Sequence, residues 1–69
     1  MSDLKYTNWQ ERVIDEYNDL SFRITKLSDF LNRYEHGKVD DVQDINLLRA
    51  QLQAMLAYRD ILYARIENF

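Results

Sequence analysis

The sequence contains no cysteine, no proline and a single glycine among its 69 residues. Without cysteine the chain forms no disulfide, and with one histidine a zinc site would depend on carboxylates, which structural zinc rarely accepts. The scarcity of proline and glycine argues against a turn-rich β fold and favours helices. A chain this short buries too little apolar surface to be comfortably stable alone, so we expect it to gain stability by oligomerising.

A strong charge of one sign and long apolar runs are also missing. The formal net charge is −3 and the isoelectric point is about 4.9, so we expect no nonspecific binding to nucleic acid or to an anionic membrane. No apolar stretch approaches the ~20 residues needed to span a bilayer, and the first residues lack the apolar run of a signal peptide. The sequence therefore predicts a soluble intracellular protein.

Hydrophobic residues make up 46% of the chain, and they fall at helical spacing. Thr7 and Gln10 form a capping-box pattern, which predicts a helix over about 8–35 after a loose tail over 1–6. Gly37 predicts its end in a turn over about 36–40, because glycine readily adopts a left-handed conformation. The apolar residues of this helix form a heptad-like seam. They are Trp9, Val13, Tyr17, Leu20, Ile24, Leu27, Leu31 and Tyr34.

A second helix is predicted over about 41–68, with Asp40 or Asp41 as its N-cap and Asp44 in its first turn. The short connection makes the two helices an antiparallel, coiled-coil-like hairpin, so residues 7–69 are expected to form one all-α domain. The seam of the second helix consists of Ile45, Leu48, Leu52, Met55, Leu62, Ile66 and Phe69.

The second helix is apolar well beyond its seam. One antiparallel partner covers only a stripe of a helix, and a lone hairpin would leave the rest of this face in water. We expect the surplus face to join copies of the chain into a homo-oligomeric helical bundle, for example a dimeric four-helix bundle. The predicted interface residues are Leu47, Ala54, Leu56, Tyr58 and Ile61.

Catalytic motifs are missing from the sequence. It has no glycine-rich phosphate loop, no His-Glu metal pair at helical spacing and no Ser-His-Asp or Cys-His set. Carboxylates such as Asp15, Asp19 and Asp29 lie away from the seam, as expected for a solvated face. We therefore predict that the protein is not an enzyme and holds no metal or cofactor.

Two polar residues interrupt the seams, Glu16 in the first helix and Arg59 in the second. Folding the hairpin about Gly37 brings them level with each other, which predicts an ion pair. Such a pair either sets the register and the oligomer geometry or faces a ligand, and the sequence leaves both roles open.

Aromatic and arginine residues gather toward the open end of the predicted hairpin. Arginine grips phosphate oxygens bidentately and aromatic rings stack on bases, so this mixture suits a small nucleotide. The same residue types anchor protein interfaces, and that alternative also stays open. The candidate ligand-binding residues are Trp9, Arg12, Glu16, Tyr58, Arg59 and Arg65.

Both halves of the chain resemble a family of very small tailed-phage proteins related to crAss-like phages. In the first half the resemblance lies in Trp9-Gln10, Arg12-Val13-Ile14, Glu16, Leu20, Ile24, Lys26-Leu27 and Phe30-Leu31. In the second half it lies in Leu47-Leu48, Gln51-Leu52, Ala54-Met55, Tyr58, Ile61-Leu62, Arg65-Ile66 and Phe69. Arg59 falls where the family pattern is open, so a pair between Glu16 and Arg59 is not implied for the whole family.

The resemblance implies an accessory phage protein in the cytoplasm of an infected bacterium. By analogy of fold, other small phage helical hairpins form oligomers that sequester cyclic-nucleotide or ADP-ribose-type signals of CBASS and Thoeris immunity. Our leading hypothesis is a non-enzymatic anti-defence protein that traps such a signal in clefts between subunits. The alternative is a protein-binding or assembly module that grips a host or phage protein with the apolar face of the second helix.

Overall fold

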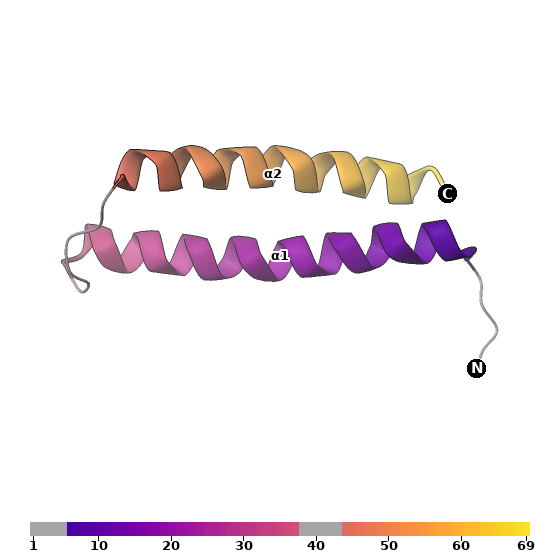
Figure 1. The fold of residues 1–69 in the computed structure, drawn as a ribbon, viewed down its shortest axis with the longest axis horizontal. Helices are drawn as coiled ribbons and strands as arrows, with labels where there is room; N and C mark the ends of the chain where they lie inside the picture. The colour runs from indigo at the N-terminus through magenta and orange to yellow at the C-terminus, as the bar shows by residue number, and fades with distance from the viewer. Residues whose placement is uncertain (1–5, 38–43) are drawn as a thin grey trace.

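The computed structural model describes residues 6–37 and 44–69. This part of the chain forms two long helices that lie side by side in opposite directions (Figure 1). Helix α1 runs over Asn8–Glu35 and helix α2 over Ile45–Glu67. The prediction of an all-helical hairpin is confirmed.

Helix α1 begins at the residues that the capping-box pattern indicated. Thr7 is the N-cap with extended backbone, and its N–H donates a hydrogen bond to Oε1 of Gln10 over 2.9 Å. The N–H of Glu11 donates to the carbonyl oxygen of Thr7, also over 2.9 Å. These bonds satisfy backbone donors that would otherwise lack partners at the helix start.

Helix α1 ends at Glu35, and Gly37 follows with a φ of +70°. The expectation of a left-handed glycine after the helix is therefore confirmed. The N–H of Gly37 donates to the carbonyl oxygen of Tyr34 over 3.0 Å, which closes the last turn. The ring of His36, which is exposed, lies with Nδ1 2.8 Å from the carbonyl oxygen of Asn32.

Helix α2 begins at Ile45, later than the predicted start near residue 41. Asp44 is its N-cap and has left-handed backbone with φ 58° and ψ 44°, a conformation that a right-handed helix cannot continue. Its carbonyl oxygen accepts the N–H groups of Leu47 and Leu48, at 2.9 and 3.2 Å. Asp40 and Asp41, which the sequence suggested as caps, lie outside the described residues.

The core of the hairpin is one cluster of aliphatic side chains. Val13, Leu20 and Ile24 of α1 pack with Leu62 of α2, whose exposed fraction is 0%. Every buried residue of α1 belongs to the predicted seam, which confirms the seam for these residues, whereas the predicted seam residue Trp9 is 49% exposed. Half-buried side chains complete the cluster: Tyr17, Leu52, Met55, Leu56, Ile66 and Phe69. The core is therefore thin, because α2 contributes a single fully buried residue within the described part of the chain.

The outer face of α2, turned away from α1, keeps its apolar residues in water. Leu47 is 66% exposed and Ile61 is 57% exposed. Leu47, Ala54 and Ile61 follow one another at intervals of seven residues, and Ala54 is exposed as well, so the three form a stripe along the helix. Tyr58 is 40% exposed beside this stripe. Leu56 differs from the other predicted interface residues, because it is half-buried and packs against the core of its own hairpin.

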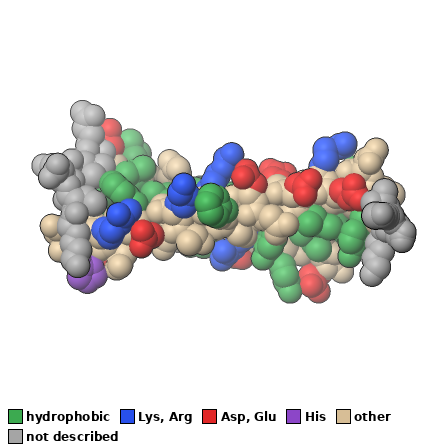
Figure 2. All heavy atoms as spheres, turned by 90° about the horizontal axis from the view of Figure 1, so that it is seen from below, with side chains coloured by type: hydrophobic (Ala, Val, Ile, Leu, Met, Phe, Trp, Pro, Cys, Tyr) green, Lys and Arg blue, Asp and Glu red, His purple; other side chains and the backbone are tan. Residues whose placement is uncertain are grey.

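Neither described helix combines the length and the apolar character needed to cross a membrane. On the face seen in Figure 2, acidic and basic side chains are interspersed and hydrophobic ones gather toward both ends. On such a surface the positive and negative charges largely offset each other over longer distances. An anion-binding site therefore depends on a few neighbouring positive side chains and not on the overall charge of the surface.

Candidate functional site

An aromatic cluster of Tyr6, Trp9 and Phe69 closes the open end of the hairpin. The Trp9 ring meets Phe69 edge-on, with 5.3 Å between ring centroids, and Tyr6 packs on Phe69 at 5.8 Å. Tyr6 was predicted to belong to the loose tail, but its ring joins this cluster. Trp9 remains 49% exposed, so part of the indole is open to a second ring that stacks on it.

Glu16 binds Tyr58 rather than Arg59. The Tyr58 hydroxyl donates a hydrogen bond to Oε2 of Glu16, across the gap between the helices. The predicted ion pair between Glu16 and Arg59 is wrong: within residues 6–37 and 44–69 the ion pairs are Asp19–Arg23, Asp29–Arg33 and Glu35–Arg49. Arg59 keeps its predicted seam position after Met55 and is half-buried, whereas Glu16 is exposed beside the seam of α1, so the two side chains do not meet.

The hydrogen bond to Glu16 raises the pKa of Tyr58 above its ordinary value of 10.0. Partial burial and the negative charge of Glu16 raise this pKa further, while the positive charge of Arg65 lowers it. Arg65 acts on the phenol through its charge, and the contact that joins the two helices here is the hydrogen bond from Tyr58 to Glu16.

We expect Glu16→Gln to lower the pKa of Tyr58 toward 10.0, because the substitution removes the carboxylate that favours the neutral phenol. Because the pKa of Tyr58 is higher in the folded protein than in the unfolded chain, the bond between Tyr58 and Glu16 stabilises the fold fully below pH 10.0. This contribution to the free energy of unfolding is lost as the pH rises through the pKa of Tyr58 in the folded protein. Alkaline absorbance titration of the wild type, with Tyr58→Phe subtracted, measures this shift.

Glu67→Gln is the matched control for this titration. Glu67 raises the pKa of Tyr63 through a hydrogen bond, so removing it is expected to move Tyr63 and leave Tyr58 unchanged. A Tyr58 titration that is the same with and without Glu16 would contradict the interhelical bond.

Arg12 and Arg65 lie on the flank of the hairpin that carries the bond between Glu16 and Tyr58. Arg12 precedes Glu16 by four residues, and Arg65 follows Tyr58 by seven, so each pair shares a helix face. Both arginines are exposed. The structure thus brings Arg12, Glu16, Tyr58 and Arg65 to one flank, with Trp9 at its end, while Arg59 faces the seam.

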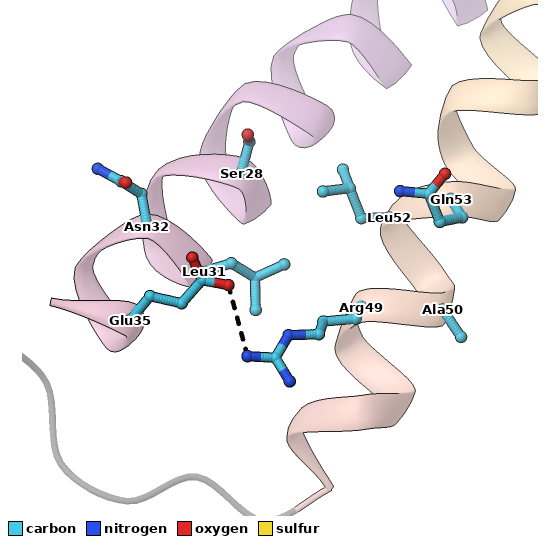
Figure 3. Close-up of a pocket in the computed structure, with 8 residues that line it drawn as sticks. All are labelled: Ser28, Leu31, Asn32, Glu35, Arg49, Ala50, Leu52 and Gln53. Atoms are coloured by element: carbon cyan, nitrogen blue, oxygen red, sulfur yellow. Dashed lines mark hydrogen bonds and ion pairs between the residues drawn. The ribbon is translucent and has the colours of Figure 1, made fainter. Parts of the chain in front are cut away.

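Among the described residues, a turn-end groove and a basic groove lie between the helices, and none of the six predicted ligand-binding residues lines either of them. The turn-end groove has a volume of about 510 Å³, and the side chains of Leu31 and Leu52 point toward each other on its floor (Figure 3). The Arg49 guanidinium lies 3.4 Å from Oε2 of Glu35, and both side chains line this groove, so the lining carries no net charge. The remaining lining residues are Ser28, Asn32, Ala50 and Gln53. Polar side chains without net charge suit a neutral polar group.

The basic groove, with a volume of about 490 Å³, lies nearer the middle of the hairpin. Its lining residues are Leu20, Arg23, Lys26, Leu27, Gln51 and Met55. Neither groove was predicted from the sequence. In the sequence the grooves are marked by polar side chains one helical turn apart beside the seams. Any solvent-exposed flank of a helix carries such side chains, so the pattern does not distinguish a groove.

No three His, Cys, Asp or Glu side chains gather into a possible metal site within the described ranges 6–37 and 44–69. The arrangement of the flank is one of hydrogen-bond donors, guanidinium groups and open aromatic faces. Such groups bind an anionic ring-bearing molecule by phosphate contacts and stacking.

The family comparison matches residues 7–68 to the model of the Sequestin family, which includes both helices. The chain belongs to the Sequestin family. The name of the family is that of a sequestering protein, which is consistent with a binding role rather than a catalytic one, and it specifies no ligand. Searches of curated proteins and of solved structures find no match to this Sequestin. Its predicted relation to crAss-like phages stays a prediction.

Proposed function

We propose that this protein sequesters a small nucleotide signal of host immunity without converting it. The observation that carries the proposal is the match to the Sequestin family over residues 7–68. The ligand classes that we propose are a cyclic dinucleotide or an ADP-ribose derivative of the kind produced in CBASS and Thoeris immunity. The protein would then act as an anti-defence protein of a phage in the cytoplasm of its bacterial host.

The flank near the open end supports this ligand class by its chemistry. Arg12 and Arg65 supply guanidinium forks for phosphate oxygens, and Trp9 and Tyr58 supply rings for a base. The hydrogen bond from Tyr58 to Glu16 holds that ring in one orientation before a ligand arrives. A held ring loses less conformational freedom on binding, which favours affinity.

We further propose that copies of the chain associate through the outer face of α2 and that the binding clefts lie between subunits. A single hairpin exposes Leu47 and Ile61 by more than half. Covering them removes apolar surface from water, at roughly 25 cal/mol per Å². Tyr58 lies between this face and the ligand flank, so a second subunit placed there adds a wall to the cleft.

The binding proposal predicts that Arg12→Ala and Arg65→Ala each weaken nucleotide affinity about tenfold, the effect of one lost charge-assisted hydrogen bond of roughly 1.4 kcal/mol. Affinity is also expected to fall with added salt, because exposed charges are screened. Calorimetry with a cyclic dinucleotide and with ADP-ribose measures both effects. Chromatography of the ligand after heat release is expected to return it intact.

Arg33→Ala is the control for these variants, because Arg33 is an exposed arginine of α1 that pairs with Asp29 and lies about 30 Å along the helix from Arg12, near the turn. It is expected to bind as the wild type does. Unchanged affinity in the Arg12 and Arg65 variants would overturn the residue assignment, and a cleaved ligand would overturn sequestration in favour of catalysis.

A protein-binding module is the second candidate function, favoured by the exposed Leu47 and Ile61 on α2. An amphipathic helix face of this kind docks into a partner's groove through residues spaced one or two turns apart. This candidate predicts that no nucleotide binds and that a stoichiometric protein partner copurifies. Ile61→Glu would then abolish copurification.

A further inference from the structure

The basic groove gathers positive charge that the open-end flank does not account for. Arg23 and Lys26 line it from α1, one turn apart, and Gln51 lines it from α2. No carboxylate is among its lining residues. In a chain with a net charge of −3, a groove lined by two cations and an amide is a local exception that favours an anion.

Both cations are held in place by neighbours on their own helix. Asp19, one turn before Arg23, contacts its guanidinium at 3.1 Å, which leaves further N–H donors of the fork free. The Lys26 ammonium lies 5.1 Å from the centroid of the Phe22 ring. Such contacts restrict long side chains and reduce the entropy lost when an anion binds.

The floor of the groove is apolar. Leu20 is buried, Leu27 and Met55 are half-buried, and all three line the groove beneath the cations. An apolar floor with a few polar groups at its rim is typical of small-molecule sites. It suits a ligand that carries a phosphate on one side and a flat or apolar portion on the other.

The position of the groove relates it to the open-end flank. Arg23 follows Glu16 by seven residues, and Gln51 precedes Tyr58 by seven. Seven residues are two helical turns, so the groove lies about 10 Å along the same flank from the bond between Glu16 and Tyr58. A molecule in which phosphates join two sugar or base portions, such as ADP-ribose, is long enough to reach from the groove to Tyr58.

We propose that the basic groove of Arg23, Lys26 and Gln51 binds a phosphate group of the sequestered nucleotide, whose base or sugar lies on the apolar floor. That the ligand is a nucleotide follows from the proposed function. That its phosphate binds here is inferred from the residues that line the groove. The ligand then lies along the flank from this groove toward Tyr58.

The test uses the full chain with Arg23→Gln and Lys26→Gln, both of which keep long side chains that suit a helix. Arg33→Gln is the matched control, because Arg33 pairs with an aspartate four residues earlier, at 3.3 Å, as Arg23 does, but lies outside the groove. Calorimetry with ADP-ribose and with a cyclic dinucleotide measures affinity. An NMR titration with pyrophosphate alone follows the side-chain amide of Gln51.

We expect each groove variant to weaken nucleotide binding about tenfold, the double variant more, and Arg33→Gln not at all. Nucleotide binding that the groove variants leave unchanged would overturn this inference and leave the proposed function standing. Pyrophosphate shifts at Gln51 without any nucleotide binding would uphold the anion site and overturn the proposed function. If neither probe binds, both proposals fall.

Discussion

Leu62→Ala is expected to remove a large part of the stability of the hairpin. Leu62 has an exposed fraction of 0% and, within the described part of the chain, is the one fully buried residue that α2 adds to the cluster of Val13, Leu20 and Ile24. Truncating a buried leucine costs about 2–5 kcal/mol, and a domain of this size has a total stability of roughly 3–10 kcal/mol. Urea unfolding followed by circular dichroism measures the loss.

Phe22→Ala is the control for Leu62→Ala. Phe22 is 62% exposed on α1, and its described contact is with the ammonium group of Lys26. Losing this contact is expected to cost at most about 1 kcal/mol. A similar loss of stability from both substitutions would contradict the central place of Leu62 in the core.

The second large expected effect is on molecular mass. We expect multi-angle light scattering at micromolar concentration to return at least twice the chain mass of 8.4 kDa. The physical reason is the apolar outer face of α2, where Leu47 and Ile61 are exposed, combined with a thin core. The double variant Leu47→Glu with Ile61→Glu places charges on this face and is expected to return the mass of a single chain.

Phe22→Glu is the control, since it places a glutamate at an exposed apolar position of the other helix. It is expected to keep the mass of the wild type. A wild-type protein that remains monomeric and folded at this concentration would contradict self-association, and with it the clefts between subunits.

The heptad-like spacing of apolar residues was sufficient to predict the hairpin. Val13, Leu20, Ile24 and Leu31 are buried, and all four stand in the predicted seam. The cap residues Thr7 and Gln10 and the glycine at position 37 mark where α1 begins and ends, because capping depends on local hydrogen bonds and backbone preferences. Asp44 is the N-cap of α2 and does not lie in its first turn as predicted, because an aspartate is favoured at both places and the sequence does not separate them.

The candidate site was predicted less well than the fold. The sequence placed Glu16 level with Arg59, and the structure places its hydrogen-bond partner one residue earlier, at Tyr58. One residue along a helix turns a side chain by about 100°, so an error of this size changes the face without changing the level. The sequence suggested Arg59 as the partner of Glu16 because their charges are opposite. A tyrosine hydroxyl that points across the gap between the helices also donates a hydrogen bond to the carboxylate.

By itself the sequence determined the two helices, the stripe that each one buries and the apolar excess of α2, because these follow from local propensity and from spacing along one chain. Only the tertiary structure decided the bond between Tyr58 and Glu16 and the residues that share the basic groove, Arg23 and Lys26 with Gln51. These contacts depend on the rotation of each helix about its own axis and on the register between helices. Packing of the two seams sets both quantities, and many sequences with the same spacing would set them differently.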